Sequence, residues 1–546
     1  MDLLSVGRGA AQDASRWLQA GLLALAVGLG GCPAGGPADQ VGLGKRLWSG
    51  SVRSLPASAD GAWLALLDGC VEVKGRLLPV GTATCDLKML STSGGDPRLV
   101  ARGVPTLAHG AVFAPEGGAL AVLADYDFES GSGTLLVARD GVAREVARGV
   151  TFHGFVPGSA GALLAVAGGT LWYAPPQGAP RQVTGGAGVA SFELAQGPGD
   201  AAMVGLTRQP IGAGGALLAL SPGFDRARLL ATGTTEYGLS RHGDLFAYAV
   251  REKAETALWL GRGGKARRIG PGARLFTLAP GGEAVAWISE VAPGRQGDLQ
   301  MAVPGGEPAR LAREVGEFRW ATAAPRLAWL EQYDPRGRAG VLGVGGPGVA
   351  PRRFGKNVTD FELSADGERV TFLRHTVEGG YSVDLWSGEV AGEPRQVARG
   401  VFGFSFSPDG RWVYYRTRCT RNGDACDLER VAAGGVAALQ PELIAAAVKS
   451  FEFDPRDPGR LLVTWQRADL VALDFGVWRD GKMVQVDRGA LPGSIRFLGP
   501  DSRRLSYAVV QAKRAGAYVA VLPVPVSRSQ SSSADGGPRG GPPPSK

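Results

Sequence analysis

The stretch that decides the fold is Phe404-Ser-Phe-Ser-Pro-Asp-Gly-Arg-Trp-Val-Tyr-Tyr415, in which two apolar runs flank a Pro-Asp-Gly turn. Proline fixes φ near about −65°, and glycine accepts a positive φ without steric cost, so Pro408–Gly410 predicts a tight turn. Aromatic and β-branched residues that alternate with polar residues on either side predict β-strands. The stretch is therefore expected to form a β-hairpin.

Copies of this hairpin recur along the whole chain. The clearest copies are Ala57–Gly61, Val112–Gly117, Phe276–Gly282 and Phe361–Gly367. Weaker copies centre on Phe155, Leu194, Leu239, Trp320, Phe453 and Phe497. From Phe113 onward the copies follow one another at intervals of 39 to 47 residues. A period in the forties with strand patterning predicts the blades of a β-propeller, whereas helical repeats would need apolar residues at i, i+3 and i+4.

The complete unit has the pattern of four short strands, and the fourth strand is basic, as in Pro394–Arg399. The last unit contains only three strands, Ile495–Leu498, Leu505–Val510 and Ala517–Leu522. An isolated fourth strand, Lys45–Ser49, stands at the beginning of the repeats. We therefore expect the N-terminal strand to complete the last blade, which would tie the two ends of the chain together and remove an exposed sheet edge.

Ser407–Gly410, followed by Arg-Trp-Val-Tyr-Tyr, resembles the WD-like propeller repeat of TolB-type proteins, and the resemblance covers most of residues 45–526. The family implies an all-β propeller in the bacterial envelope that often serves as a protein-binding platform. The size differs, because the TolB propeller itself has six blades. Eleven blades in one ring would leave a wide axial hole, so we expect two adjoining propellers, 45–316 and 317–526. One large ring is the alternative.

The N-terminus indicates export. Residues 1–31 contain an apolar run of about ten residues, Ala20–Leu29, which has the length of a signal-peptide core and is too short to span a bilayer. Leu29-Gly-Gly-Cys32 resembles the bacterial lipobox, so Cys32 is expected to carry a lipid anchor. The alternative is a general secretory signal. We predict a tether at 32–44, a disordered tail at 527–546, and a place in the bacterial cell envelope, with the outer membrane preferred.

Four cysteines remain if Cys32 is lipidated, and an even number in an exported chain is what two disulfides require. Three pairings are possible. The context favours Cys70 with Cys85 and Cys419 with Cys426, because each pair brackets a loop and each second cysteine precedes Asp-Leu. The alternative is four unrelated buried thiols.

Composition excludes some classes of protein. The chain has 546 residues, of which 44% are hydrophobic, which supplies ample material for a core and argues against disorder. It has 85 Gly and 36 Pro, which indicates many turns. The net charge is +8, but the basic residues cluster only in doublets such as Arg267-Arg268. Nucleic-acid binding needs several cations on one face, so we do not expect it.

The sequence offers little catalytic chemistry, and we expect no catalytic residue, metal or cofactor. The four histidines, at positions 109, 153, 242 and 375, fall in separate repeats, and no G-x-S-x-G motif is present. Asp125, Asp127 and Glu129 could contribute to a Ca²⁺ site, but an ordinary loop between strands is the preferred interpretation.

We therefore expect a lipid-anchored, non-catalytic scaffold that binds another envelope protein. One alternative is a hydrolase or lyase acting on a polysaccharide or peptide, with two carboxylates, or a histidine and a carboxylate, converging on the axis. Another is a small-ligand binder with a deep pocket lined by aromatic side chains.

Overall fold

The computed structural model describes residues 42–53, 55–74, 78–79, 81–107, 109–196, 203–207, 214–221, 223–252, 255–262, 265–289, 296–375, 383–421, 423, 425–433, 440–466, 472–511 and 513–523. The expected signal peptide 1–31, the lipidation of Cys32 and the tail 527–546 lie outside these residues. Within them every regular element is a β-strand, and no helix is long and apolar enough to cross a membrane.

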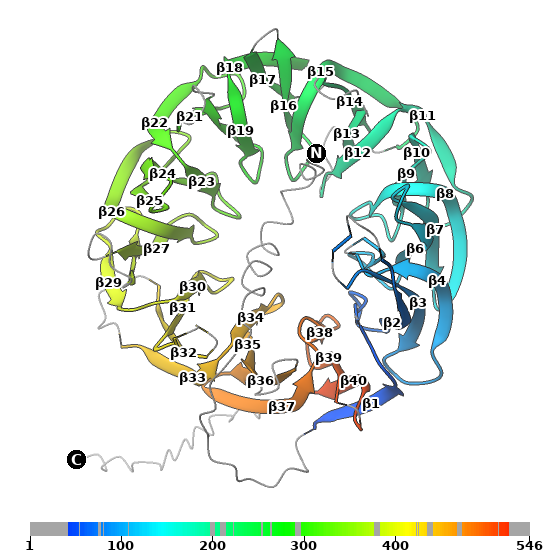
Figure 1. The fold of residues 1–546 in the computed structure, drawn as a ribbon. Helices are drawn as coiled ribbons and strands as arrows, with labels where there is room; N and C mark the ends of the chain where they lie inside the picture. The colour runs from blue at the N-terminus through cyan, green and yellow to red at the C-terminus, as the bar shows by residue number, and fades with distance from the viewer. Residues whose placement is uncertain are drawn as a thin grey trace, which may run out of the picture.

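The described strands form eleven antiparallel blades, which confirms the all-β propeller (Figure 1). Within each blade the first strand lies nearest the centre of the ring and the fourth lies at the perimeter (Figure 1). Blade 1 consists of Ala57, β2 (Trp63–Glu72), β3 (Ala83–Ser91) and β4 (Arg98–Pro105), and blade 2 consists of β5 (Ala111–Phe113), β6 (Leu120–Asp127), β7 (Ser132–Arg139) and the start of β8 (Val142–Phe155). Blade 3 consists of the end of β8, β9 (Leu163–Ala167), β10 (Thr170–Ala174) and β11 (Arg181–Ala187), and blade 4 consists of β12 (Val189–Leu194), β13 (Met203–Thr207), β14 (Gly215–Leu220) and the start of β15 (Ala227–Leu239).

The remaining blades repeat the same order of four strands. Blade 5 consists of the end of β15, β16 (Leu245–Glu252), β17 (Glu255–Arg262) and β18 (Lys265–Pro271), and blade 6 consists of β19 (Ala273–Leu278), β20 (Val285–Ser289), β21 (Gly297–Ala302) and β22 (Ala309–Val315). Blade 7 consists of β23 (Glu317–Trp320), β24 (Leu327–Asp334), β25 (Ala339–Gly346) and the start of β26 (Val349–Leu363), and blade 8 consists of the end of β26, β27 (Arg369–His375), β28 (Val383–Glu389) and β29 (Arg395–Ala398). Blades 9 to 11 consist of β30 (Gly403–Phe406), β31 (Trp412–Thr417), β32 (Cys426–Ala432) and β33 (Glu442–Val448); β34 (Ser450–Asp454), β35 (Asp457–Gln466), β36 (Leu473–Arg479) and β37 (Lys482–Ala490); and β38 (Arg496–Leu498), β39 (Arg504–Val509), β40 (Gly516–Val521) and β1 (Gly44–Ser49).

The turn between β30 and β31 shows why the repeated motif makes a hairpin. The Ser407 hydroxyl donates to Asp409 Oδ1 at 2.6 Å and accepts the backbone N–H of Trp412 at 2.9 Å. Gly410 takes φ +66°, which a side chain would disfavour. Burial alone would raise the pKa of Asp409, but the hydrogen bonds from Ser407 and Arg411 lower it below its ordinary value. The carboxylate therefore stays ionised and holds the turn.

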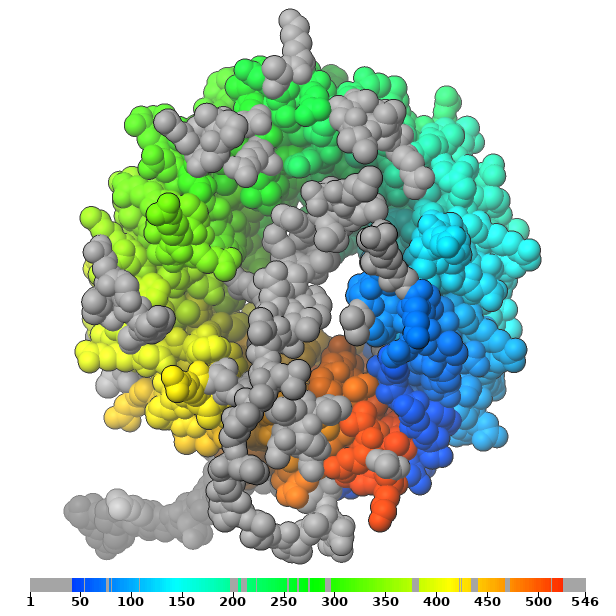
Figure 2. Space-filling model, viewed as in Figure 1, coloured from blue at the N-terminus to red at the C-terminus, as the bar shows by residue number. Residues whose placement is uncertain are grey.

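The blades form one ring, so the two adjoining propellers expected from the sequence are wrong and the single-ring alternative is correct (Figure 1). Each of the eleven interfaces between neighbouring blades contains its own cluster of buried apolar side chains. At the expected division near residue 316, Ile288 of blade 6 packs with Phe318 and Trp329 of blade 7. Because blades 6 and 7 are packed against each other, neither blade can instead pair with another blade to close a smaller ring. Figure 2 shows an opening at the centre of the single ring.

The N-terminal strand closes the ring as expected. β1 pairs antiparallel with β40, from Gly44 opposite Ala520 to Ser49 opposite Gly516, and becomes the fourth strand of blade 11. Leu498 and Ala508 of blade 11 pack against Leu64 of blade 1. The end of the repeats therefore meets their beginning through strand pairing and through a shared core.

Candidate functional site

The antiparallel order gives the ring two different faces. We call the turn face the one that carries the turns between first and second strands, such as 407–410, and between third and fourth strands. We call the crossing face the one that carries the loops between second and third strands and the crossings from each fourth strand to the next blade, such as 102–103. Loops on a rigid scaffold are the usual place for recognition, so both faces are candidates.

Arginines on the turn face join neighbouring blades. Arg98 in the fourth strand of blade 1 donates to the carbonyl of Asp140 in blade 2 at 2.6 Å, and Arg352 in blade 7 donates to that of Val390 in blade 8 at 3.0 Å. The same kind of contact is made by Arg144 to Gly178, Arg181 to Phe224, Arg267 to Gly306, Arg369 to Gly410, Arg460 to Ser502 and Arg504 to Gly61. Much of the basic surplus in the sequence therefore has a structural role, because each guanidinium satisfies a carbonyl of the next blade.

Basic residues also recur on the crossing face. At the crossings one residue takes a positive φ, for example Gly103 at 62° and Gly400 at 61°. The residue directly before it is basic in six blades, at Arg102, Arg148, Arg313, Lys356, Arg399 and Arg488. Arg148 pairs with Glu145 at 2.9 Å, and Arg488 is half-buried.

Four of these side chains, Arg102, Arg313, Lys356 and Arg399, are exposed, and we call them the crossing cations. Among the described residues we find no hydrogen bond or ion pair to the charged group of any crossing cation. They differ in this respect from the arginines that join blades on the turn face. Their charges are free to meet an external anion.

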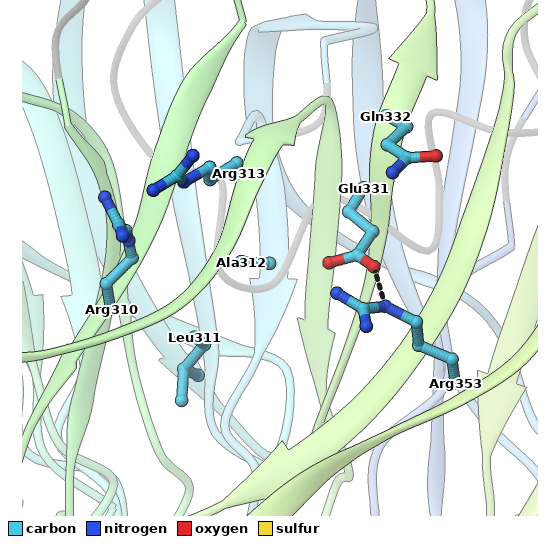
Figure 3. Close-up of a pocket in the computed structure, with 7 residues that line it drawn as sticks. All are labelled: Arg310, Leu311, Ala312, Arg313, Glu331, Gln332 and Arg353. Atoms are coloured by element: carbon cyan, nitrogen blue, oxygen red, sulfur yellow. Dashed lines mark hydrogen bonds and ion pairs between the residues drawn. The ribbon is translucent and has the colours of Figure 1, made fainter.

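A cavity of about 250 Å³ opens between blades 6 and 7 beside one crossing cation (Figure 3). β22 contributes Arg310, Leu311, Ala312 and Arg313, β24 contributes Glu331 and Gln332, and β26 contributes Arg353. The Glu331 side chain is 4% exposed and accepts a hydrogen bond from Arg353 Nε. This hydrogen bond raises the pKa of Arg353 further above its ordinary value, so the guanidinium stays charged.

A second cavity, of about 400 Å³, lies on the turn face between blades 5 and 6, beside Arg262, Lys265 and Arg267. Arg262 lies 3.5 Å from Asp244, and Arg267 lies 3.4 Å from Glu307 and also binds the carbonyl of Gly306. Two of its three cations thus have partners within the protein. Neither cavity is the deep pocket lined by aromatic side chains that a small-ligand binder was expected to show.

Two carboxylates in first strands, Glu193 and Glu362, join neighbouring blades at the inner wall of the ring. Glu193 of blade 4 accepts the backbone N–H of Leu239 of blade 5 at 3.0 Å, and Glu362 of blade 8 accepts that of Phe406 of blade 9 at 3.4 Å. Burial raises the pKa of Glu193 above its ordinary value. These carboxylates satisfy backbone donors at the inner edge of the next blade, which is a structural use of the group.

Of the four histidines, His109 and His153 lie next to each other. His153 is buried, and its Nε2 lies 3.1 Å from the carbonyl oxygen of His109 in the neighbouring blade. Burial lowers the pKa of His153 to about 4, so the ring is neutral and donates this bond at neutral pH. His242 lies in an exposed turn and His375 at the end of β27.

The acidic loop of blade 2 is a turn. The carboxylate of Asp127 accepts the backbone N–H of Glu129 at 3.0 Å and that of Ser130 at 3.1 Å, which is the geometry of an Asx turn. Within the described part of the chain no group of three or more His, Cys, Asp or Glu side chains could hold a metal ion.

The cysteine pairs follow the expectation. Disulfides join Cys70 to Cys85 in blade 1 and Cys419 to Cys426 in blade 9. Cys70 lies in the second strand of its blade and Cys419 in the loop after the second strand, and each partner lies in the third strand. Both therefore staple equivalent loops on the crossing face. Cys32, the expected lipidation site, lies outside the described residues.

The crossing cations were not recognised from the sequence, although a signal was present. Val-Ala-Arg-Gly-Val occurs at 100–104, 146–150 and 397–401, always at the junction between two repeats. Its regular position shows that the arginine belongs to the repeat. Whether the arginine of each copy has a hydrogen-bond or ion-pair partner depends on residues of the neighbouring blade, and these residues are not part of the motif.

No family model matches the chain, and no curated protein matches it. Several solved structures do. A eukaryotic initiation factor matches with 15% identity and a TM-score of 0.40 over 66% of this chain and 94% of its own. The propeller domain of the Trilobed protease from Pyrococcus furiosus matches with 11% identity and a TM-score of 0.28 over 55% of this chain and 97% of its own.

TolB from Acinetobacter baumannii is similar with 16% identity and a TM-score of 0.22, over 42% of this chain and 60% of its own. At these identities the likeness concerns the fold alone. The function of the chain therefore has to be argued from its own residues.

Proposed function

We propose that the protein is a non-catalytic binding scaffold of the bacterial cell envelope, anchored by a lipid on Cys32, which binds the acidic surface of a partner protein with its crossing face. The observation that carries the proposal is a set of exposed cations that recurs at equivalent positions in four crossings of this face. Many arginines of the turn face join neighbouring blades, whereas the charged groups of Arg102, Arg313, Lys356 and Arg399 have no hydrogen bond or ion pair within the described structure. Complementary charge speeds association and selects the partner.

Apolar side chains on the same face would add affinity. Phe402, at the crossing into blade 9, is 58% exposed and lies under the Arg416 guanidinium, 5.3 Å from its central carbon. Leu107, at the crossing into blade 2, is 41% exposed, and Val71, beside the disulfide of blade 1, is 67% exposed. Exposed aromatic and aliphatic side chains next to cations are typical of protein-binding surfaces.

Rigidity favours binding by this face. The two disulfides hold loops of the crossing face in blades 1 and 9, and apolar clusters fix each blade to its neighbours. A preorganised surface loses little conformational entropy when a partner binds. The alternative, a hydrolase or lyase at the axis, needs convergent carboxylates, but Glu193 and Glu362 instead accept backbone donors of the next blade.

The experiment compares two charge-neutralised proteins. In the first, all four crossing cations are replaced by glutamine. In the second, the matched control, the replacements are four exposed cations of the turn face, Arg226, Lys265, Arg395 and Lys482, so that net charge falls equally. Proteins captured from detergent-solubilised envelopes by the wild type are compared with those captured by each variant.

We expect the crossing variant to bind its partner at least about tenfold more weakly, and the control variant to bind like the wild type. Wild-type binding should also weaken as salt concentration rises. Equal binding by all three proteins, or equal loss in both variants, would contradict the proposal.

A further inference from the structure

The cavity between blades 6 and 7 has an unusual set of charges. Arg310 and Arg313 line one side of the opening, and Glu331 and Arg353 line the other (Figure 3). Arg310 pairs with Asp298 at 3.3 Å, and Arg353 pairs with the buried Glu331. Arg313 is left as the cation without a counter-ion among the described residues, so the site carries one uncompensated positive charge.

The repeat itself supplies a comparison for this site, because every blade interface has equivalent positions. Strand register makes Leu99 of blade 1 equivalent to Arg310, since Leu99 lies opposite Lys88 just as Arg310 lies opposite Gln300. In the same way Ala124 is equivalent to Glu331.

Glu145 of blade 2 is equivalent to Arg353 by the same comparison of register. The interface between blades 1 and 2 therefore keeps the crossing cation, Arg102, but has leucine, alanine and glutamate where the other interface has Arg310, Glu331 and Arg353. The charged set is thus not a requirement of the fold, since the same strand geometry forms without it.

The buried carboxylate has a clear role in this arrangement. Glu331 is 4% exposed, and a carboxylate this deep is stable only when it is paired and hydrogen-bonded. Its bond to Nε of Arg353 orients the guanidinium, and within the described part of the chain no hydrogen bond engages the two terminal nitrogens of Arg353. A guanidinium whose Nε is fixed in this way offers its remaining N–H groups to an oxyanion in a defined geometry.

We propose that this cavity binds a phosphate group, either free or on a small ester, between Arg313 and Arg353. Two guanidinium groups can supply several N–H donors to the oxygens of a single phosphate. The volume of about 250 Å³ suits a small anion. The site does not depend on the docking of a partner protein.

The test is isothermal titration calorimetry with the purified protein at low ionic strength in a phosphate-free buffer. Inorganic phosphate and glycerol 3-phosphate are titrated separately, with acetate as a third ligand. We expect one phosphate-type site per chain with a dissociation constant in the millimolar range or below, and weaker binding of acetate. Tighter binding of glycerol 3-phosphate than of inorganic phosphate would assign the site to an ester, and the reverse order would assign it to the free anion.

The critical variant is Arg313→Gln, because Arg313 is exposed and makes no described contact that folding would lose. Affinity for the phosphate ligand should fall about tenfold or more, while Arg102→Gln, at the equivalent position of blade 1, should leave it unchanged. Thermal unfolding checks that both variants fold. No phosphate binding by the wild type, or an equal loss of affinity in the two variants, would overturn the proposal. Because the measurement uses the protein alone, such a result would leave the partner-binding proposal standing.

Discussion

Arg504 in blade 11 donates a hydrogen bond from Nη2 to the carbonyl oxygen of Gly61 in blade 1, at 3.3 Å, although 443 residues separate them. Its Nη1 also donates to Thr92 Oγ1 at 3.1 Å. Arg369 makes the equivalent contact with Gly410 between blades 8 and 9, at the same distance of 3.3 Å. The ring is therefore closed by the same interaction that joins neighbouring blades elsewhere.

Replacing Arg504 with methionine tests this closure. Methionine keeps much of the side-chain length but cannot donate to Gly61 or Thr92, so the interface should lose about 1.5 to 3 kcal/mol, the usual range for a charged hydrogen bond. We expect faster amide hydrogen exchange in β2, β3, β39 and β40, and little change in blades 5 and 6. Arg503→Met, in the adjacent exposed position, should leave exchange unchanged. An equal increase in exchange rate in all blades of Arg504→Met would contradict a local role of Arg504 in closing the ring.

Much of the fold follows from the sequence. The spacing of motifs such as Ser407–Gly410 predicted eleven four-stranded blades, and the isolated strand near Lys45–Ser49 predicted how the last blade is completed. These features are local, because a hairpin depends on its own turn and on alternation within its own strands. The two disulfides also followed from local context, since each joins strands that are neighbours along the chain.

The number of rings did not follow, because it depends on the packing between blades. Ile288 and Trp329 are in contact across the expected boundary, and the sequence motif of neither blade predicts this contact. The phosphate site was missed for the same reason. Arg313 and Arg353 lie in different blades, and only the assembled interface brings them to one cavity.

The neutral His153 makes stability depend on pH. Burial lowers its pKa to about 4, whereas an unfolded histidine titrates near 6.5. Between these values the unfolded state binds more protons than the folded state. The contribution of the neutral His153 to the free energy of unfolding is therefore complete above about pH 6.5 and is lost as the pH falls toward 4. The difference between the two pKa values corresponds to a loss of about 3 kcal/mol in the free energy of unfolding over this pH range.

His153→Gln removes the titrating group and keeps an amide that can donate to the carbonyl of His109. We expect its thermal midpoint to lie below that of the wild type at pH 7.5, and the gap to narrow as the pH falls to 4.5. His242→Gln, in an exposed turn, serves as the control and should follow the wild type at every pH. A gap for His153→Gln that stays constant across this range would contradict a neutral, buried histidine.

The disulfides should stabilise loops of the crossing face. Peptide mapping without reduction should recover Cys70 linked to Cys85 and Cys419 linked to Cys426, and a link between Cys70 and Cys419 would be incompatible with the blade structure. The double variant Cys419→Ser with Cys426→Ser should lose about 2 to 3 kcal/mol of stability by the chain-entropy relation. Hydrogen exchange should report this loss mainly in β31 and β32, with blade 1 serving as the internal control.

The proposed lipid anchor on Cys32 predicts a change in membrane fractionation. Cys32→Ser removes the acceptor of the acyl chains, so the protein should move from the membrane fraction to the soluble fraction after export. Cys426→Ser also removes one cysteine, but it leaves Cys32 intact, and this variant should remain with the membrane. Continued membrane association of Cys32→Ser after a high-salt wash would contradict lipid anchoring at this residue.

Site-specific photo-crosslinking tests the central claim most directly, that the crossing face binds a partner protein. A photoreactive amino acid is placed at Lys356 on the crossing face or at Lys482 on the turn face, two exposed lysines in outermost strands of the ring. After irradiation of the cells that make the protein, the account predicts a discrete protein adduct from position 356 and none from position 482. An adduct from position 482 alone, or no protein adduct from either position, would contradict it.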